Sequence, residues 1–337
     1  MIYKRVKTNL ANTLDSMEQE KARYDDYAKL LLSDPQVLAN IIKAIVPEFE
    51  HMPVSEIVKC IGEVEATLSF PELLMIKLDN SGVEDIDAES GKIIYDIKFM
   101  LYYKGEERIY IVNLEAQKSS DSSKLGYELK NRMVYYICRM VSSQKGTEFI
   151  RSSYDDIKKV YSIWICMDAK EGEESIIKYS MNPELIYGSP ENIWDIELLN
   201  GAVINISTDN EATYKENKNK LISMLELLFS STDVNKKDME LENKFGIKMT
   251  TELKGVAIDM CNVSDLIEER GIKRGRLDSM VLIITKKIKK NKPLSEIASD
   301  LEQDEAEIRP IYEAVLKAAP DYDVDHIIGM LDTKIEI

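Results

Sequence analysis

The chain has few of the residues that most catalytic and metal-binding motifs require. It contains only two histidines in 337 residues, His51 and His326, and they lie far apart in the sequence. Neither has a nucleophile motif beside it, so Ser-His-Asp and Cys-His catalysis are not expected, and an HExxH zinc site is excluded. The four cysteines form no CxxC pair, which is typical of reduced thiols in a cytoplasmic protein; they are Cys60, Cys138, Cys166 and Cys261.

Long apolar runs and glycine-rich phosphate loops are also missing. No run of about 18 apolar residues occurs, so we expect no membrane span. Residues 1–8 carry positive charge with no apolar segment behind them, so we expect no secretory signal. Neither GxGxxG nor GxxxxGK[ST] is present, which leaves a nucleotide cofactor unsupported. We therefore expect a cytoplasmic protein, bacterial by the resemblance described below, with any catalysis resting on carboxylates and a metal ion.

The charge of the chain is strongly negative but uneven. The formal net charge is −16, which argues against bulk electrostatic binding of nucleic acid. Residues 271–292, however, hold eight basic residues against one acidic residue. This stretch, with Lys273, Arg274 and Arg276 as its first cations, could contact DNA phosphates or could be an ordinary solvated helix face.

The order of elements predicts an α/β fold with a mixed sheet flanked by helices. A helix capped by Asp34 precedes a β-hairpin, and a helix over 121–145 leads to an apolar strand over 160–167. A strand reached by a helical crossover lies parallel to the one before it. We expect a flexible N-terminus over 1–20, an α/β domain over 21–230, a helical extension over 231–292 and a small helix-turn-helix-like region over 293–337. The last region could equally be a helical cap without a DNA role.

The hairpin brings two carboxylates together. Residues 92–103 and 108–117 are rich in β-branched and aromatic residues, with a Gly-Glu turn between them. If the register is symmetric about the turn, paired positions sum to about 211, which sets Asp96 opposite Glu115 on one face of the sheet. Gln117 and Lys98 point to the same face, because side chains alternate along a strand.

Like charges opposite each other destabilise a sheet, and a divalent cation between them removes the problem. Asp96 and Glu115 are therefore candidate Mg²⁺ ligands. The alternative is that both carboxylates are solvated, or that the register slips and they never meet. An upstream acid could complete the site, with Glu84 among several candidates. Arg132 could hold a phosphate, or could pair with Glu128 one helical turn away.

The chain resembles the PD-(D/E)XK nuclease family transposases, relatives of the recombination-promoting nucleases. The matching stretches are 27–42, 95–99, 112–117, 132–136, 154–165, 260–265 and 268–275. The resemblance implies a restriction-endonuclease-like core and Mg²⁺-dependent (or Mn²⁺-dependent) DNA endonuclease activity. It implies that Asp96 and Glu115 bind the metal and that Gln117 stands where such enzymes usually have a lysine.

A glutamine can hydrogen-bond the attacking water but cannot take its proton. Lys98, on the same face as Asp96, is a candidate for the missing positive charge. DNA is the expected partner, and a homodimer is compatible with the helical C-terminal region. The alternative to an enzyme is a catalytically inactive DNA-binding or protein-interaction module that keeps the nuclease fold.

Overall fold

The computed structural model describes residues 9–70, 84–87, 91–104, 108–193, 196–208 and 218–332. The chain divides into two compact units, one over Arg23–Cys261 and one that joins Met1–Ala22 to Asn262–Ile337. Helices α1 (Asn9–Leu32) and α8 (Thr251–Ile288) each contribute to both units. Residues 9–20, which we expected to be flexible, belong to helix α1. The boundaries of the two units also differ from the domain boundaries expected from the sequence.

The larger unit is built on a six-stranded mixed sheet, as the sequence predicted, with strand order β1-β4-β5-β6-β8-β7. Strands β5, β6 and β8 are parallel, and the other neighbouring pairs are antiparallel. Their bounds are β1 (Ile61–Ala66), β4 (Ile97–Tyr103), β5 (Arg108–Gln117), β6 (Lys159–Cys166), β7 (Ser175–Met181) and β8 (Ile196–Asn205). A separate two-stranded sheet pairs β2 (Glu84–Asp87) with β3 (Gly91–Ile94).

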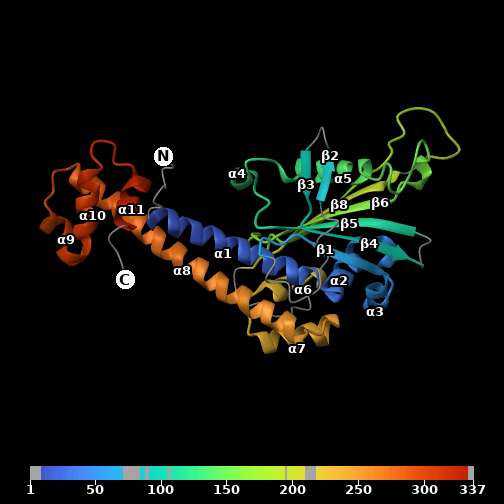
Figure 1. Ribbon diagram of the computed structural model, residues 1–337, viewed down its shortest axis with the longest axis horizontal. Coiled ribbons are helices and arrows are strands. Elements are labelled where there is room, and N and C mark those ends of the chain that lie inside the picture. Colours follow the sequence, from blue (N-terminus) through green and yellow to red (C-terminus); the bar gives the residue numbers. More distant parts are fainter. Residues whose placement is uncertain are drawn as a thin grey trace, which may run out of the picture. The chain divides into compact units, whose positions relative to one another are not determined.

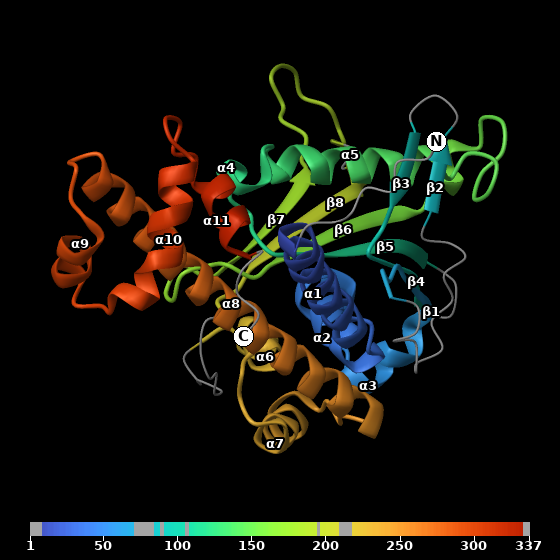
Figure 2. The ribbon, with the colours of Figure 1, turned by 60° about the vertical axis from the view of Figure 1, so that its left-hand side comes forward.

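Helices cover both faces of the six-stranded sheet (Figure 1). On one face, α5 (Leu129–Ser142) packs Met133 and Tyr136 against Trp164 of β6. Helix α2 (Pro35–Ile45) lies on the opposite side, as the second view also shows (Figure 2). From Val160 onward β6 is fully buried, because a central parallel strand is covered on both faces. The remaining elements of this unit are η1 (Pro47–Phe49), α3 (Val54–Ile57), η2 (Val58–Cys60), α4 (Ser122–Leu125), η4 (Tyr154–Asp156), α6 (Lys220–Phe229) and α7 (Val234–Phe245).

The helix expected over 121–145 is interrupted. Helix α4 ends at Gly126, whose φ of 76° lies in the left-handed region that glycine adopts without strain. Helix α5 then begins at Leu129 and keeps the expected apolar stripe, with Leu129, Met133, Tyr136 and Met140 all buried. The break separates the exposed start of this segment from the helix that packs on the sheet.

The smaller unit contains a helical C-terminal region, as expected. The end of α8 packs with α9 (Leu294–Leu301), α10 (Glu305–Lys317) and α11 (Val324–Asp332) around one apolar core. Members of this core include Val281, Ile284, Ile297, Ile308, Val315 and Ile327. Among the described helices of the whole chain, none combines the length and apolar character that a membrane span requires.

The start of α2 shows how the sequence sets a helix boundary. Asp34 is its N-cap and accepts hydrogen bonds from the backbone N–H groups of Gln36 and Val37, while Pro35 takes the first helical position. This arrangement satisfies backbone donors that have no partner within the helix. Six apolar residues of α2 are buried, so the cap helps to hold a core element in place.

We expect Asp34→Ala to lower the free energy of unfolding by about 1 kcal/mol, because it removes the cap acceptor. Urea unfolding followed by circular dichroism measures the change. Asp34→Asn is the matched control, since its amide oxygen can still accept both hydrogen bonds. An equal loss in the two variants would contradict a role for the cap hydrogen bonds.

Candidate active site

The candidate site lies where a strand expected to be continuous is interrupted. Strand β3 ends at Ile94 and β4 begins at Ile97, so Tyr95 and Asp96 form a bend between the two sheets. The expected register is confirmed: Ile97 pairs with Leu114 and Tyr103 with Arg108, so positions sum to 211 throughout β4 and β5. The proposed Gly105-Glu106 turn lies outside the described residues.

Asp96 and Glu115 hold each other in place through reciprocal hydrogen bonds. The backbone N–H of Asp96 donates to Glu115 Oε1 at 3.1 Å. In return, the backbone N–H of Ala116 donates to Asp96 Oδ2 at 3.1 Å. Each carboxylate thus accepts a hydrogen bond from a backbone N–H at, or next to, the other acidic residue. These bonds extend the contact between the two chain segments past the end of the regular β4–β5 ladder. The two carboxylates meet as the sequence predicted.

Lys29 of α1 supplies a positive charge to this pair. Its ammonium lies 2.9 Å from Asp96 Oδ1 and also donates to the backbone oxygen of Thr67 at 3.1 Å. Thr67 in turn donates from its backbone N–H to Asp96 O, and from its hydroxyl to Tyr95 O. The bend is therefore fastened both to the end of β1 and to α1. Asp96 raises the pKa of Lys29 despite the opposing effect of its burial.

Glu115 is the buried member of the pair, with only 2% of its surface exposed. Burial, followed by repulsion from Asp96, raises its pKa from the usual 4.5 to about 8. The hydrogen bond from Asp96 N–H and the charges of Arg132 and Lys29 oppose this rise without cancelling it. The positive charge around Glu115 therefore offsets its burial and its repulsion from Asp96 only in part.

Arg132 of α5 approaches Glu115 from the covering helix and is surrounded by aromatic rings. Its Nη2 lies 3.9 Å from Glu115 Oε2 and donates to the Tyr136 hydroxyl at 2.8 Å. Its Nη1 donates to the Tyr127 hydroxyl at 2.7 Å, and the Trp164 ring centroid lies 5.2 Å from its Cζ. These contacts orient the guanidinium toward the carboxylates.

Arg132 pairs with Glu115 rather than with Glu128, the alternative partner that the sequence left open. Glu128 precedes α5 as its N-cap residue and lies 3.7 Å from Lys130, whereas the carboxylate nearest Arg132 belongs to Glu115. The difference arises because the helix begins at Leu129, which leaves Glu128 in extended backbone outside the first turn. Arg132 thereby belongs to the site itself.

Asp25 is an acidic neighbour that the sequence did not single out. It lies one helical turn before Lys29 on α1, and it interacts electrostatically with Lys29 and Asp96. The pKa of Asp25 is raised to about 6, first because the surrounding chain removes part of its water. The residue nevertheless keeps an exposed surface. Repulsion from Asp96 adds to the rise, while Lys29 and Lys118 oppose it. The i, i+4 spacing of Asp25 and Lys29 was the available signal.

The other sequence candidates take varied positions. Gln117 closes β5 on the same face as Glu115 and is half-buried. Lys98 lies opposite both Glu65 and Asn113, with its ammonium 5.5 Å from the Tyr95 ring centroid. The side chain of Glu84 lies outside the described residues. The lysine that the structure places against Asp96 is thus Lys29, from a different element.

The basic stretch over 271–292 is partly neutralised within the smaller unit. Arg274 pairs with Asp278 at 3.2 Å and with Asp325 of α11 at 2.9 Å. Lys287 and Lys292 both pair with Asp300 of α9, at 2.6 and 2.8 Å. Arg276 is exposed, and the side chain of Lys273 lies outside the described residues. Part of the stretch's charge is therefore used in pairing with the helices that follow it.

The donor set is compatible with a hard divalent cation. Asp96, in the bend before β4, and Glu115 of β5 offer oxygen ligands, which suits Mg²⁺, an ion that keeps several water ligands and takes one or two carboxylates from protein. In the part of the chain that the structure describes, no group of three or more acidic, histidine or cysteine side chains forms a complete metal cluster. Water and substrate oxygens would have to supply the remaining ligands.

No protein-family model, curated protein or solved structure matches the chain. The assignment of function therefore rests on the chemistry of these residues.

The raised pKa of Glu115 predicts a pH dependence of stability. Between pH 4.5 and about 8 the folded state keeps a proton that the unfolded chain has released, so stability falls as pH rises through this range. Glu115→Gln removes the titrating group and keeps an oxygen that can accept from Asp96 N–H. We expect this variant to gain stability over the wild type progressively from pH 5 to 8, reaching a few kcal/mol.

Urea unfolding at a series of pH values tests this expectation. Glu128→Gln, at an exposed glutamate, is the matched control and should track the wild type throughout. A constant offset between Glu115→Gln and the wild type from pH 5 to 9 would contradict the raised pKa.

Proposed function

We propose that the chain is a metal-dependent nuclease that hydrolyses phosphodiester bonds in DNA, with Asp96 and Glu115 at its centre. The observation that carries the proposal is the buried carboxylate of Glu115, held against Asp96 by reciprocal backbone hydrogen bonds and with a raised pKa. Strongly perturbed carboxylates of this kind cluster at functional sites. The element order also agrees with the PD-(D/E)XK core that the sequence resembles.

Asp96 and Glu115 would hold Mg²⁺, or Mn²⁺ in its place. When bound, the ion would polarise the scissile phosphate and lower the pKa of the attacking water. Gln117, next on the same face of β5, would orient that water by hydrogen bonding but could not accept its proton. A carboxylate or a substrate phosphate oxygen would have to accept it.

Lys29 is the chain's candidate for the positive charge that a motif lysine normally supplies. Its ammonium already lies 2.9 Å from Asp96, so it stands at the edge of the proposed metal site. A cation there would stabilise the negative charge that develops on the phosphate in the transition state. Arg132 would act differently, by orienting Glu115 from within its aromatic surroundings.

A second function is supported by the same contacts. Both oxygens of Asp96 are already used, one by Lys29 and one by the backbone N–H of Ala116. The pair could therefore be a structural device in a module that binds DNA or protein without cleaving, and the net charge of −16 suits a protein partner. In that case Lys29 would replace the metal rather than assist it.

Nicking of supercoiled plasmid in the presence of Mg²⁺ separates the two functions. We expect the wild type to nick DNA, and Asp96→Asn to reduce the rate at least 100-fold while DNA binding is kept, because one metal ligand is lost. Glu128→Gln, at an exposed glutamate just before the helix that carries Arg132, is the control and should match the wild type. Equal nicking by Asp96→Asn and wild type would contradict the proposed site, and no nicking by the wild type would favour the non-catalytic module.

Replacement of Lys29 tests its part in the reaction. We expect Lys29→Met to lower the nicking rate at saturating Mg²⁺ by about 100- to 1,000-fold, the range typical of losing one transition-state donor. We also expect half-saturation at a lower Mg²⁺ concentration, because the ammonium no longer competes for Asp96. Lys29→Arg should recover part of the rate, and Lys130→Met, at an exposed lysine, should change neither quantity. A lower rate with unchanged Mg²⁺ dependence would indicate a structural role alone.

A further inference from the structure

The larger unit has a polar cavity at the end of the sheet opposite to the two carboxylates. It has a volume of about 490 Å³, and its lining includes Arg108, Lys159, Tyr161, Lys178 and Ser180. We call it the Lys178 cavity. It lies at the starts of β5 and β6, where Arg108 and Lys159 are the first residues, whereas Glu115 lies near the end of β5. Its volume is in the range of small-molecule sites.

The Lys178 cavity also opens on the other face of the sheet. Tyr161 pairs with Val112, and Trp164 pairs with Glu115, so Tyr161 and Glu115 point to opposite faces. Lys178 pairs with Ala202, which neighbours Ile163 on the same face as Tyr161. The cavity and the carboxylate pair are therefore at opposite ends and on opposite faces of one sheet, and a ligand in one would not contact the other.

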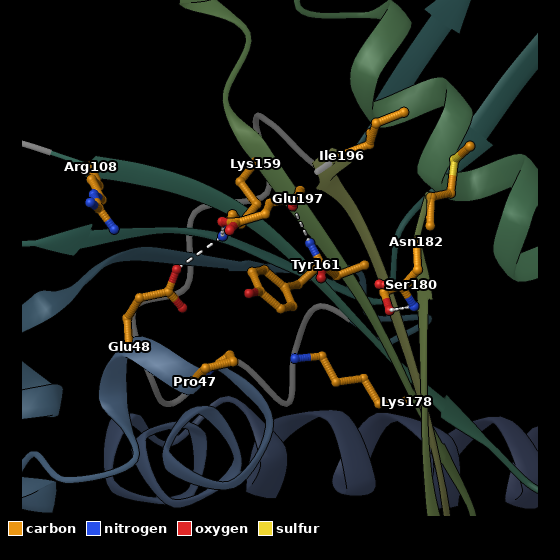
Figure 3. A pocket seen from close by; sticks show the side chains of 12 residues that line it. Pro47, Glu48, Arg108, Lys159, Tyr161, Lys178, Ser180, Asn182, Ile196 and Glu197 are labelled. Atoms are coloured by element: carbon orange, nitrogen blue, oxygen red, sulfur yellow. Dashed lines mark hydrogen bonds and ion pairs between the residues drawn. The ribbon is translucent and has the colours of Figure 1, made fainter. Parts of the chain in front are cut away.

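The cavity carries a surplus of positive charge in an acidic protein. Lys159 is neutralised by Glu48 at 2.9 Å and by Glu197 at 2.8 Å (Figure 3). Lys178 and Arg108 remain, and neither has a carboxylate within ion-pair distance among the residues that the structure describes. The charged lining is therefore three cations, Arg108, Lys159 and Lys178, against the two carboxylates of Glu48 and Glu197, which leaves one positive charge in excess.

Lys178 directs its ammonium into the open space. In Figure 3 the side chain extends from β7 toward Tyr161 and Pro47. Partial loss of water lowers the pKa of Lys178, an effect that Glu48 and Glu197 oppose and Lys159 reinforces. The ammonium is thus partly desolvated inside the cavity. The hydroxyl group of Ser180 and the amide group of Asn182 also line the wall.

We propose that the Lys178 cavity binds a small organic phosphate, with Lys178 and Arg108 as its cationic contacts. A phosphate monoester carries a charge of about −1.5 to −2 near pH 7, and the excess positive charge of the cavity attracts such an anion. An arginine fork can engage two phosphate oxygens at once, and a lysine adds a compact point charge. A long polyanion would instead meet the excess negative charge of the rest of the chain, so a small ligand suits this site better than nucleic acid. The proposal is independent of the nuclease activity.

Isothermal titration calorimetry with adenosine monophosphate, inorganic phosphate, adenosine and succinate tests the proposal. We expect the two phosphate-bearing probes to bind, and adenosine and succinate to bind at least tenfold more weakly than adenosine monophosphate. Lys178→Met and Arg108→Met should each weaken phosphate binding at least tenfold. Lys170→Met is the matched control and should stay within twofold of the wild type, because exposed Lys170 follows the opposite end of β6.

Three results would overturn the proposal: no binding of either phosphate-bearing probe at millimolar concentration, equal weakening by Lys170→Met and Lys178→Met, or succinate binding as tightly as adenosine monophosphate. Urea midpoints of the variants report whether they fold normally. Since Lys178 is exposed on an edge strand, we expect its variant to unfold at the wild-type urea concentration.

Discussion

Repulsion between two neighbouring carboxylates is the constraint around which the larger unit is organised. Asp96 and Glu115 meet across β4 and β5, and the chain accommodates them with reciprocal backbone hydrogen bonds and with Lys29 from α1. The bend at Tyr95 and Asp96, which separates β3 from β4, places these groups where the bonds can form. Even so, burial and the charge of Asp96 keep the pKa of Glu115 raised.

The covering helix contributes to the same balance. Arg132 reaches Glu115 from α5 while Tyr127, Tyr136 and Trp164 surround its guanidinium, which excludes water from one side of the carboxylate. A cation held near a buried acid in this way orients it without fully neutralising it. Under the proposed nuclease function, this combination would suit a group that ionises when a metal ion binds.

The sheet keeps two kinds of charge apart. Acidic groups gather near the end of β5 on the face covered by α5, and cations outnumber carboxylates at the starts of β5 and β6 on the other face. Because side chains alternate and the strands are rigidly paired, the two sites can differ in electrostatic character within one small domain. One suits a divalent cation and the other a small anion.

The sequence by itself determined the elements with strong local signals: the cap at Asp34, the buried strand β6, the mixed sheet and the register that sets Asp96 opposite Glu115. These follow from residue periodicity and strand pairing, which are local or nearly so. Only the tertiary structure decided that Lys29 and Asp25 of α1 approach Asp96, that Arg132 pairs with Glu115 rather than Glu128, and that Lys178 and Arg108 share a cavity. Such contacts join residues distant in the chain, and no spacing rule reveals them, because they depend on how helices pack against the sheet.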